Sequence, residues 1–177
     1  LGFDLDDGTT GEITKEYIAA NYAPPTLELT RIYDSHTGNH RTLALAALNA
    51  GQNAVNHIDH CNYDIIGLGS YNHDWHYTSA DINASTNGDR QTMFYSVGCF
   101  PAAFDQITCI AEAWEQKSGG GGHAFIGNTR YGWYNPGNPH TLSNRYDEKF
   151  FQLLWVNDLH RQGECFTAHK NSFYPSD

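Results

Sequence analysis

Two short apolar runs end at reactive side chains, and they limit the possible folds of this chain more than any other feature. Residues 53–59 lead into His60, and residues 93–98 lead into Cys99. Short apolar runs of this kind are typical of buried strands in a parallel sheet. Ligands and chemistry collect beyond the carboxyl ends of such strands. A histidine and a cysteine delivered there are therefore candidates for a thiol nucleophile and its base.

The segments around these runs alternate between helical and extended patterns. Apolar spacing and stop signals predict helices over about 12–21, 40–50, 104–117 and 144–159. Strands are expected at 26–33, 53–59, 92–97 and 123–126, and loops at 1–11, 60–90 and 127–143. This alternation predicts an α/β fold of three layers, a mostly parallel sheet with helices on both faces.

The helical predictions depend on a few apolar side chains. In residues 104–117 the positions that follow a helical repeat are Ile107, Ile110, Ala111 and Trp114. In residues 144–159 the side chains expected to face inward are Phe150, Phe151, Leu154 and Trp155. We expect the whole chain, residues 1–177, to form one domain, which can be part of a larger precursor.

Charge narrows the range of partners. Twenty acidic and ten basic side chains give a net charge of −10, which argues against nucleic acids and anionic membranes as partners. No stretch approaches 18 apolar residues, so no membrane span is expected. Four widely spaced cysteines indicate free thiols with at most one or two bridges.

Cys99 and His60 are the candidate reactive pair, and each has an ordinary alternative. Gly98 permits a sharp turn before Cys99, and a thiol near a helix N-terminus favours the thiolate. The alternative is a buried structural cysteine. His60 can be an ordinary surface histidine, and His57, within the strand, is the weaker candidate for the base because it points differently.

Three motifs resemble the gingipain-type cysteine peptidases, which have a caspase-like fold. Residues 53–60 resemble the strand that leads to the catalytic histidine, and residues 94–104 the strand that ends in the nucleophile. Residues 120–133 are similar to the family's Gly-Gly-x-x-Phe-Ile-Gly-x-x-Arg-x-Gly segment. The similarity extends from about residue 10 to residue 170 and preserves order and spacing.

The resemblance implies a function and roles for individual residues. Cys99 would be the nucleophile of an endopeptidase and His60 its general base and acid, acting through an acyl-enzyme. The backbone N–H groups of Cys99 and Cys61 would hold the oxyanion. The resemblance also implies a polypeptide substrate, other segments of the chain's own precursor as partners, and a secreted or cell-surface bacterial location.

The substrate-binding assignments lie in the loop after the third motif. Trp133 and its loop, including Tyr131, take the position that shapes the primary specificity pocket in this fold. Each aromatic ring can instead pack under the loop. Arg130 is a substrate contact or a salt bridge that fixes the loop.

The residues beside the histidine depart from the family pattern. The family usually has Gly-His-Gly, whereas this chain has Asp59-His60-Cys61. Asp59 either orients His60 or is simply solvated. This departure keeps open a catalytically impaired module of the same fold that binds a peptide or a metal.

Metal binding is a further alternative to catalysis. A structural zinc site could draw on six neighbouring donors, which are His57, His60, Cys61, His73, Asp74 and His76. Their spacing matches no standard zinc finger, so we expect no metal site and no required cofactor. The acidic, carbonyl-rich loops leave calcium open as a structural ion. The acidic cluster Asp4, Asp6, Asp7 and Glu12 is either a solvated loop or a preference for basic substrates.

Overall fold

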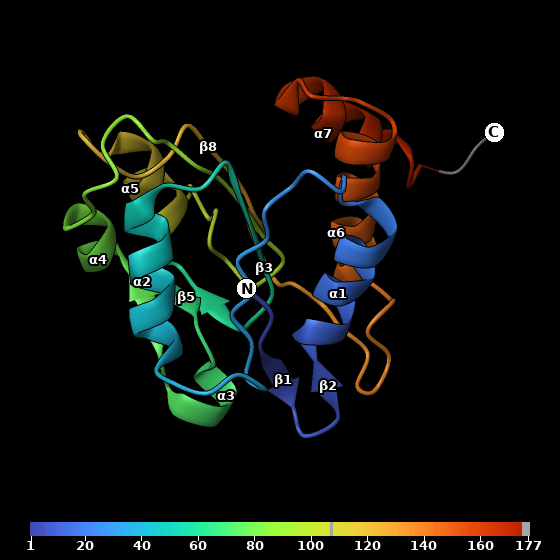
Figure 1. Cartoon of the computed structure of the whole chain (residues 1–177), viewed down its shortest axis with the longest axis horizontal. Coiled ribbons are helices and arrows are strands. Elements are labelled where there is room, and N and C mark those ends of the chain that lie inside the picture. Colours follow the sequence, from blue (N-terminus) through green and yellow to red (C-terminus); the bar gives the residue numbers. More distant parts are fainter. Residues whose placement is uncertain (107, 175–177) are drawn as a thin grey trace.

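The computed structural model describes residues 1–106 and 108–174 and has the alternating helices and strands that the sequence predicts (Figure 1). In chain order the elements are β1 (Asp4–Asp6), β2 (Thr9–Thr10), α1 (Gly11–Tyr22), α2 (His40–Ala50), β3 (Ala54–His57), β4 (Cys61–Asn62), β5 (Ile65–Gly67), α3 (Ser70–His73), β6 (His76–Thr78), α4 (Ser79–Asn83), β7 (Met93–Ser96), α5 (Ile110–Gln116), β8 (Ala124–Ile126), α6 (Ser143–Phe151), the π-helical turn η1 (Gln152–Val156) and α7 (Gln162–Asn171).

The central sheet is parallel and places β7 between β3 and β8. Beyond β3 the sheet continues through isolated bridges, because Gly2 pairs with both Ile58 and Tyr33. The predicted strand over 26–33 is therefore wrong except at its end, where Ile32 accepts a hydrogen bond from the Gly2 N–H. The predicted loop over 1–11 is also wrong, since it contains the antiparallel pair β1 and β2.

Helices cover both faces of this sheet, which confirms the three-layer prediction. In Figure 1, α2, α4 and α5 lie on one side of the central strands, and α1, α6 and α7 lie on the other. Side chains of β7 alternate between the two layers as a strand requires. Phe94 packs with Leu48 and Trp114 of the first layer, whereas Met93 and Tyr95 pack with the second.

The predicted loop over 60–90 is wrong, because it contains ordered structure. Strands β4, β5 and β6 form an antiparallel sheet, and α3 and α4 flank β6. Each strand has only two or three residues, so no period could be read from the sequence. Buried Ile66, Leu68 and Tyr77 join this sheet to the main core.

The C-terminal helices differ from the prediction in their bounds. α5 begins at Ile110 rather than at 104, and Ile107 lies outside the described residues. The helix predicted over 144–159 is α6 followed by the π-helical turn η1. Phe150, Phe151 and Leu154 are buried as expected, whereas Trp155 is half-buried. The helix α7 was not predicted.

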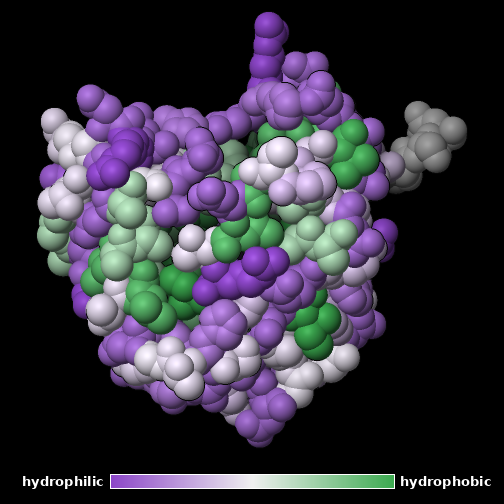
Figure 2. Space-filling view, viewed as in Figure 1, coloured by the Kyte–Doolittle hydropathy of each residue, from purple (hydrophilic) through white to green (hydrophobic). Residues whose placement is uncertain are grey.

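One face of the molecule is mostly hydrophilic. Figure 2 shows this face, on which apolar residues gather in several patches. Among the described helices, none combines the length and the apolar character that crossing a bilayer requires.

A buried ion pair joins two helices of the second layer. The Lys15 ammonium of α1 donates to the Asp147 carboxylate of α6 at 2.5 Å, and the two side chains are 4% and 0% exposed. Lys15 also donates to Asn56 Oδ1 of β3. The pair and its contact with Asn56 therefore connect α1, α6 and strand β3.

Removal of one member of this pair should destabilise the fold strongly. We expect Asp147→Ala to lower the free energy of unfolding by about 3–5 kcal/mol, because it leaves the Lys15 charge buried and unpaired. The double variant Lys15→Met/Asp147→Leu should recover most of this loss, since it removes both charges of the pair. Urea unfolding of the three proteins measures this, and equal stability of Asp147→Ala and the wild type would contradict it.

Candidate active site

The strands that lead to His60 and Cys99 are direct neighbours. β3 and β7 pair in parallel with Ala54 opposite Met93 and His57 opposite Ser96, and the Val97 N–H donates to the His57 carbonyl at 3.3 Å. Both strands therefore end at the same level of the sheet. The loops that follow β3 and β7 carry the predicted reactive side chains, and both begin at the carboxyl-terminal edge of the sheet.

The turn at Cys99 is sharp and held by backbone hydrogen bonds. Phe100 has a left-handed backbone (φ +63°), and its N–H donates to the Arg130 carbonyl at 2.8 Å. Asn128 donates from Nδ2 to the carbonyls of Val97 and Gly98, both at 2.9 Å. The Cys99 side chain is partly exposed, and its sulfur lies 3.6 Å from the Gly132 carbonyl. Asn128, which no sequence motif singles out, thus holds the backbone just before Cys99.

The orientation of the His60 ring is set by β1. Its Nε2 lies 2.9 Å from the Leu5 carbonyl oxygen, and since a carbonyl only accepts, Nε2 carries the proton. In the neutral ring Nδ1 is then left with its lone pair, as a general base requires. His60 is exposed, and Tyr134 packs edge-on at 6.4 Å between ring centroids.

Asp59 fits neither of its two predicted roles. Its side chain is buried, so it is not solvated, and among the described residues none of its hydrogen bonds is to an imidazole. Its carboxylate accepts from the His60 N–H at 2.6 Å, from the Gly69 N–H at 2.7 Å and from Ser70. Burial raises the pKa of Asp59, and these hydrogen bonds oppose the rise. Asp59 thus ties the backbone at His60 to the start of α3.

Cys61 turns its side chain into the protein. Its sulfur lies 3.6 Å from the Asp59 carbonyl and 3.7 Å from Ser96 Oγ, and burial raises the pKa of the Cys61 thiol to about 12. Gly98 provides the space, because a Cβ there would lie 2.1 Å from this sulfur. His60 accepts a backbone hydrogen bond from Gly67 of β5, so the next pair, Cys61 and Ile66, is a non-hydrogen-bonded pair. The Cys61 N–H therefore points away from β5.

His57 is a structural histidine, as its position within the strand suggested. Its Nε2 lies 2.8 Å from the Gly67 carbonyl, and its Nδ1 accepts from Ser96 Oγ at 2.9 Å. Ser96 Oγ in turn accepts from the Gly98 N–H at 3.2 Å. Burial lowers the pKa of His57 to about 3, so the ring is neutral. This chain of bonds ties β5 and β3 to the turn before Cys99.

The predicted substrate-binding residues lie in the loop that follows β8. Trp133 and Tyr131 are 64% and 61% exposed, and their ring centroids are 5.7 Å apart. Tyr131 also packs edge-on against Phe100, the residue after Cys99, at 4.7 Å. Arg130 makes a bidentate ion pair with Asp105 at 2.7 and 2.9 Å, which lowers the pKa of Asp105 to about 2.

The six candidate zinc donors do not gather at one point. His57 is held by Ser96 and Gly67, His60 by Leu5, and the Cys61 sulfur lies against Asp59 and Ser96. Within residues 1–106 and 108–174, His73 is the one member of this set that belongs to a group with metal-ligand spacing.

A separate pocket lies between residues 27–33, α1, α2 and β3, and neither Cys99 nor His60 lines it.

Comparison with known proteins places the chain. Residues 3–177 match the model of peptidase family C25. The chain belongs to peptidase family C25. This is the gingipain family, as the three sequence motifs implied. A search of curated proteins finds no match.

Solved structures of family C25 share the fold. The crystal structure of the Arg-specific cysteine proteinase gingipain R superposes with a TM-score of 0.68 at 19% identity, over 96% of this chain and 39% of that one. The complex of the Porphyromonas gingivalis RgpB pro- and mature domains gives a TM-score of 0.63 at 19% identity, over 85% and 34%. The fold is thus caspase-like, and this chain spans about two fifths of the gingipain R chain.

The neutral, buried His57 should make the stability of this C25 chain depend on pH. The unfolded imidazole binds a proton near pH 6.5, whereas the folded one resists protonation down to about pH 3. Burial of His57 therefore costs no stability above about pH 6.5. As the pH falls from 6.5 toward 3, the free energy of unfolding should decrease by at most about 1.4 kcal/mol per pH unit, because only the unfolded chain binds the proton. Urea unfolding at several pH values measures the slope.

The matched variants for this slope are His57→Gln and His160→Gln. The glutamine amide can keep both hydrogen bonds of His57 but takes no proton. The free energy of unfolding of His57→Gln should therefore fall less steeply than that of the wild type as the pH is lowered. His160 is 67% exposed on its side chain, and its variant should follow the wild type. Parallel curves for His57→Gln and the wild type would refute the assignment.

Gly98 should tolerate no side chain. We expect Gly98→Ala to destabilise the fold by about 1–3 kcal/mol, because its Cβ would lie 2.1 Å from the Cys61 sulfur and 2.7 Å from the Asp59 carbonyl. Adding Cys61→Gly should restore part of the loss. Gly163→Ala, where no heavy atom lies within 4 Å, is the matched control. If thermal unfolding finds both alanine variants equally stable, this packing argument is wrong.

Proposed function

We propose that this chain carries the catalytic dyad of a cysteine endopeptidase, with Cys99 as nucleophile and His60 as general base and acid. The observation that supports this most is the shared edge of β3 and β7, from which both loops leave. The fixed His60 ring adds to it, since its Nε2–H is engaged by Leu5 and Nδ1 is available as a base. Membership of family C25 agrees with this chemistry.

The proposed reaction proceeds in two stages. His60 Nδ1 takes the Cys99 thiol proton, and the sulfur attacks the carbonyl carbon of the scissile peptide bond. The resulting oxyanion is held by the N–H groups of Cys99 and Cys61. The intermediate collapses as His60 gives the proton to the leaving amine, which leaves an acyl-enzyme. Water, deprotonated by His60, then releases the acid and the thiol.

The residue that replaces the usual glycine after the histidine is compatible with this proposal. The Cys61 side chain packs against Gly98, and its N–H points away from β5. Its thiol is protonated at neutral pH, because burial raises its pKa to about 12, so it does not compete as a nucleophile. A backbone donor is therefore available on the side of the histidine.

Substrate binding is proposed for the exposed aromatic residues beside the nucleophile. Trp133 and Tyr131 offer flat apolar surfaces next to Phe100. Arg130 holds this loop through Asp105, which favours the salt-bridge alternative over direct substrate contact. Substrate polypeptides would lie across these rings, with the scissile bond at Cys99.

The remaining assignments concern the setting of the site. We treat residues 1–177 as one domain of a larger precursor, whose other segments are its partners; the solved complex of pro- and mature domains is a precedent in a neighbour. A secreted or cell-surface location follows from the same resemblance. The reaction as proposed uses protein groups alone, and calcium stays a prediction for the loops.

A catalytically impaired module of the same fold is the second candidate. The observation that favours it is the partner of His60, which is a neutral carbonyl instead of a carboxylate. A carbonyl orients the ring but stabilises the imidazolium less than a charge does. Such a module would bind a peptide without cleaving it.

Alkylation by iodoacetamide tests the dyad. Cys99 is partly exposed, whereas Cys109 and Cys165 are buried, and burial raises the pKa of the Cys61 thiol to about 12, which cuts its thiolate fraction about 1000-fold. We expect one label per chain, located at Cys99 by mass spectrometry. His60→Ala should slow the labelling at least about tenfold, because the imidazole no longer assists ionisation.

Two controls separate the candidates. Cys99→Ser should take no label under the same conditions and should have no activity on casein. His123→Ala, which removes a surface histidine in another loop, should label as the wild type does. Equal labelling of all four cysteines in the folded protein would refute the dyad, and fast labelling without casein cleavage would favour the impaired module.

A further inference from the structure

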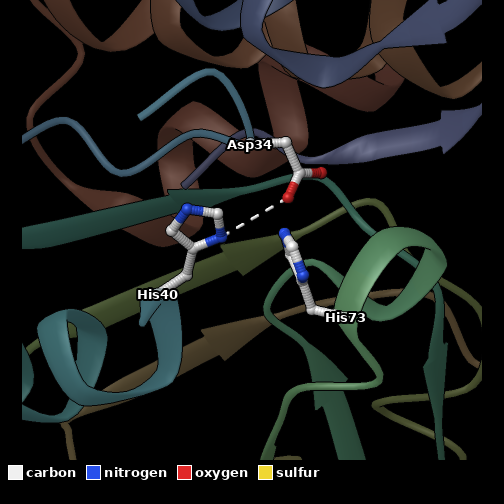
Figure 3. A group of neighbouring side chains, drawn as sticks. All are labelled: Asp34, His40 and His73. Atoms are coloured by element: carbon white, nitrogen blue, oxygen red, sulfur yellow. Dashed lines mark ion pairs between the residues drawn. The ribbon is translucent and has the colours of Figure 1, made fainter. Parts of the chain in front are cut away.

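The three side chains Asp34, His40 and His73 point toward one another (Figure 3). One carboxylate oxygen and one ring nitrogen from each histidine lie within 4.8 Å of one another. The residues come from the loop before α2, from the first turn of α2 and from α3. None of them takes part in the proposed hydrolysis.

Two atoms of this group face each other without a hydrogen-bond partner. His40 Nδ1 and Asp34 Oδ1 are both buried and unsatisfied, and they lie 3.4 Å apart. His40 Nε2 donates to the His36 carbonyl at 3.0 Å, so Nδ1 of the neutral ring presents a lone pair to the carboxylate. Two acceptors at this distance repel unless a cation lies between them.

We propose that Asp34, His40 and His73 form a binding site for a zinc ion. Two ligands at about 2.0–2.1 Å from zinc, at the tetrahedral angle, are about 3.4 Å apart, which is the separation of the Asp34 and His40 atoms. Two imidazoles and one carboxylate suit zinc, whereas calcium and magnesium select oxygen ligands. The fourth position would hold water, because His73 lies at the surface.

The surroundings of these side chains are those of metal ligands. Histidine ligands donate their other ring N–H to a fixed acceptor, as His40 does to His36. The second oxygen of Asp34 accepts from the Asp4 N–H at 2.8 Å, which orients the carboxylate. His73 stacks on Trp75 at 4.2 Å between ring centroids, so its ring is oriented as well.

Gly69 keeps the centre of the group open. Its backbone is left-handed (φ +93°), and a Cβ there would lie 2.8 Å from Asp34 Oδ1 and 3.3 Å from His40 Nδ1. A side chain at this position would therefore occupy the space that the ion needs. The Gly69 N–H is itself held by Asp59, so the opening is fixed by a buried contact.

An ion here would stabilise the support of His60. The Asp34 carboxylate binds the N–H of Asp4, and the carbonyl of Leu5, the next residue, accepts from His60. Zinc would fix Asp34 and, through it, the strand β1 that orients the imidazole. The role is structural, and the binding does not depend on whether the chain cleaves peptides.

Zinc titration of the whole chain tests this site. The background should carry Cys99→Ala, because a reactive thiol can bind zinc on its own. The protein is first treated with a chelator, which is then removed, and zinc is added. We expect elemental mass spectrometry to find one bound zinc per chain. The melting temperature should rise by about 5–10 °C when free zinc exceeds the dissociation constant 100-fold.

The ligand variants make the test specific. His73→Ala changes an exposed side chain and should weaken zinc binding at least about 100-fold, since loss of mere outer-shell partners costs 10–100-fold. Asp34→Asn should do the same. His76→Ala, three residues from His73, is the matched control and should bind as the background does.

Cobalt gives an independent readout of the same site. Bound Co²⁺ in tetrahedral N and O coordination should produce visible absorption that His73→Ala abolishes. The proposal is overturned if the chain takes up no zinc, or if His73→Ala and Asp34→Asn bind it as tightly as the background. If the chain takes up no zinc, a proton on His40 Nδ1 explains why this atom faces Asp34 Oδ1.

Discussion

The parallel pairing of β3 with β7 is the constraint on which the rest of the candidate site depends. A parallel pair with His57 opposite Ser96 ends both strands at one level, so the two loops that carry His60 and Cys99 leave together. A slip of one residue would move Phe94 and Tyr95 to the wrong layers, because side chains alternate between faces. The two apolar layers therefore fix the register of the strands. This register in turn brings the loops of His60 and Cys99 to the same edge of the sheet.

His57 connects the paired strands to the turn at Cys99 through hydrogen bonds. A neutral imidazole between a carbonyl and a hydroxyl is satisfied on both nitrogens, which makes it tolerable at 0% exposure. Ser96 then accepts from Gly98, one residue before Cys99. Cys61 fills the space that Gly98 leaves, so the two loops pack directly against each other. The site is thus supported by buried polar bonds beneath it and by one close contact between loops.

Strands with long apolar side chains could be predicted from the sequence, and so could the residues at their ends. The run before His60 and the run before Cys99 each bury side chains such as Val55 and Phe94, so their patterns carry information. The small sheet of β4, β5 and β6 could not be predicted, because two or three residues show no period. For the same reason a histidine within that region, His73, gave no sign of its distant partners Asp34 and His40.

Backbone groups set the second limit on prediction. The ring of His60 is oriented by the Leu5 carbonyl, and every residue has a carbonyl, so no side chain marks the partner. Asn128 is a similar case, since its two acceptors are the carbonyls of Val97 and Gly98. Asp59 looked like the natural partner of the imidazole because it is adjacent in sequence. Adjacent residues of a turn point differently, and Asp59 instead accepts from backbone N–H groups.

Strand β1 is where the two proposals meet. It has three residues and pairs with a strand of two, and a hairpin of this size is not stable by itself in water. Its position must therefore come from its contacts. These include the buried side chains of Leu5 and of Phe3 just before the strand, the Asp34 carboxylate on the Asp4 N–H and His60 on the Leu5 carbonyl. The Asp34 contact is the one that an ion would strengthen, because its carboxylate has a second, unsatisfied oxygen facing His40. Order in β1, and with it the orientation of the imidazole, is then coupled to the group at Asp34.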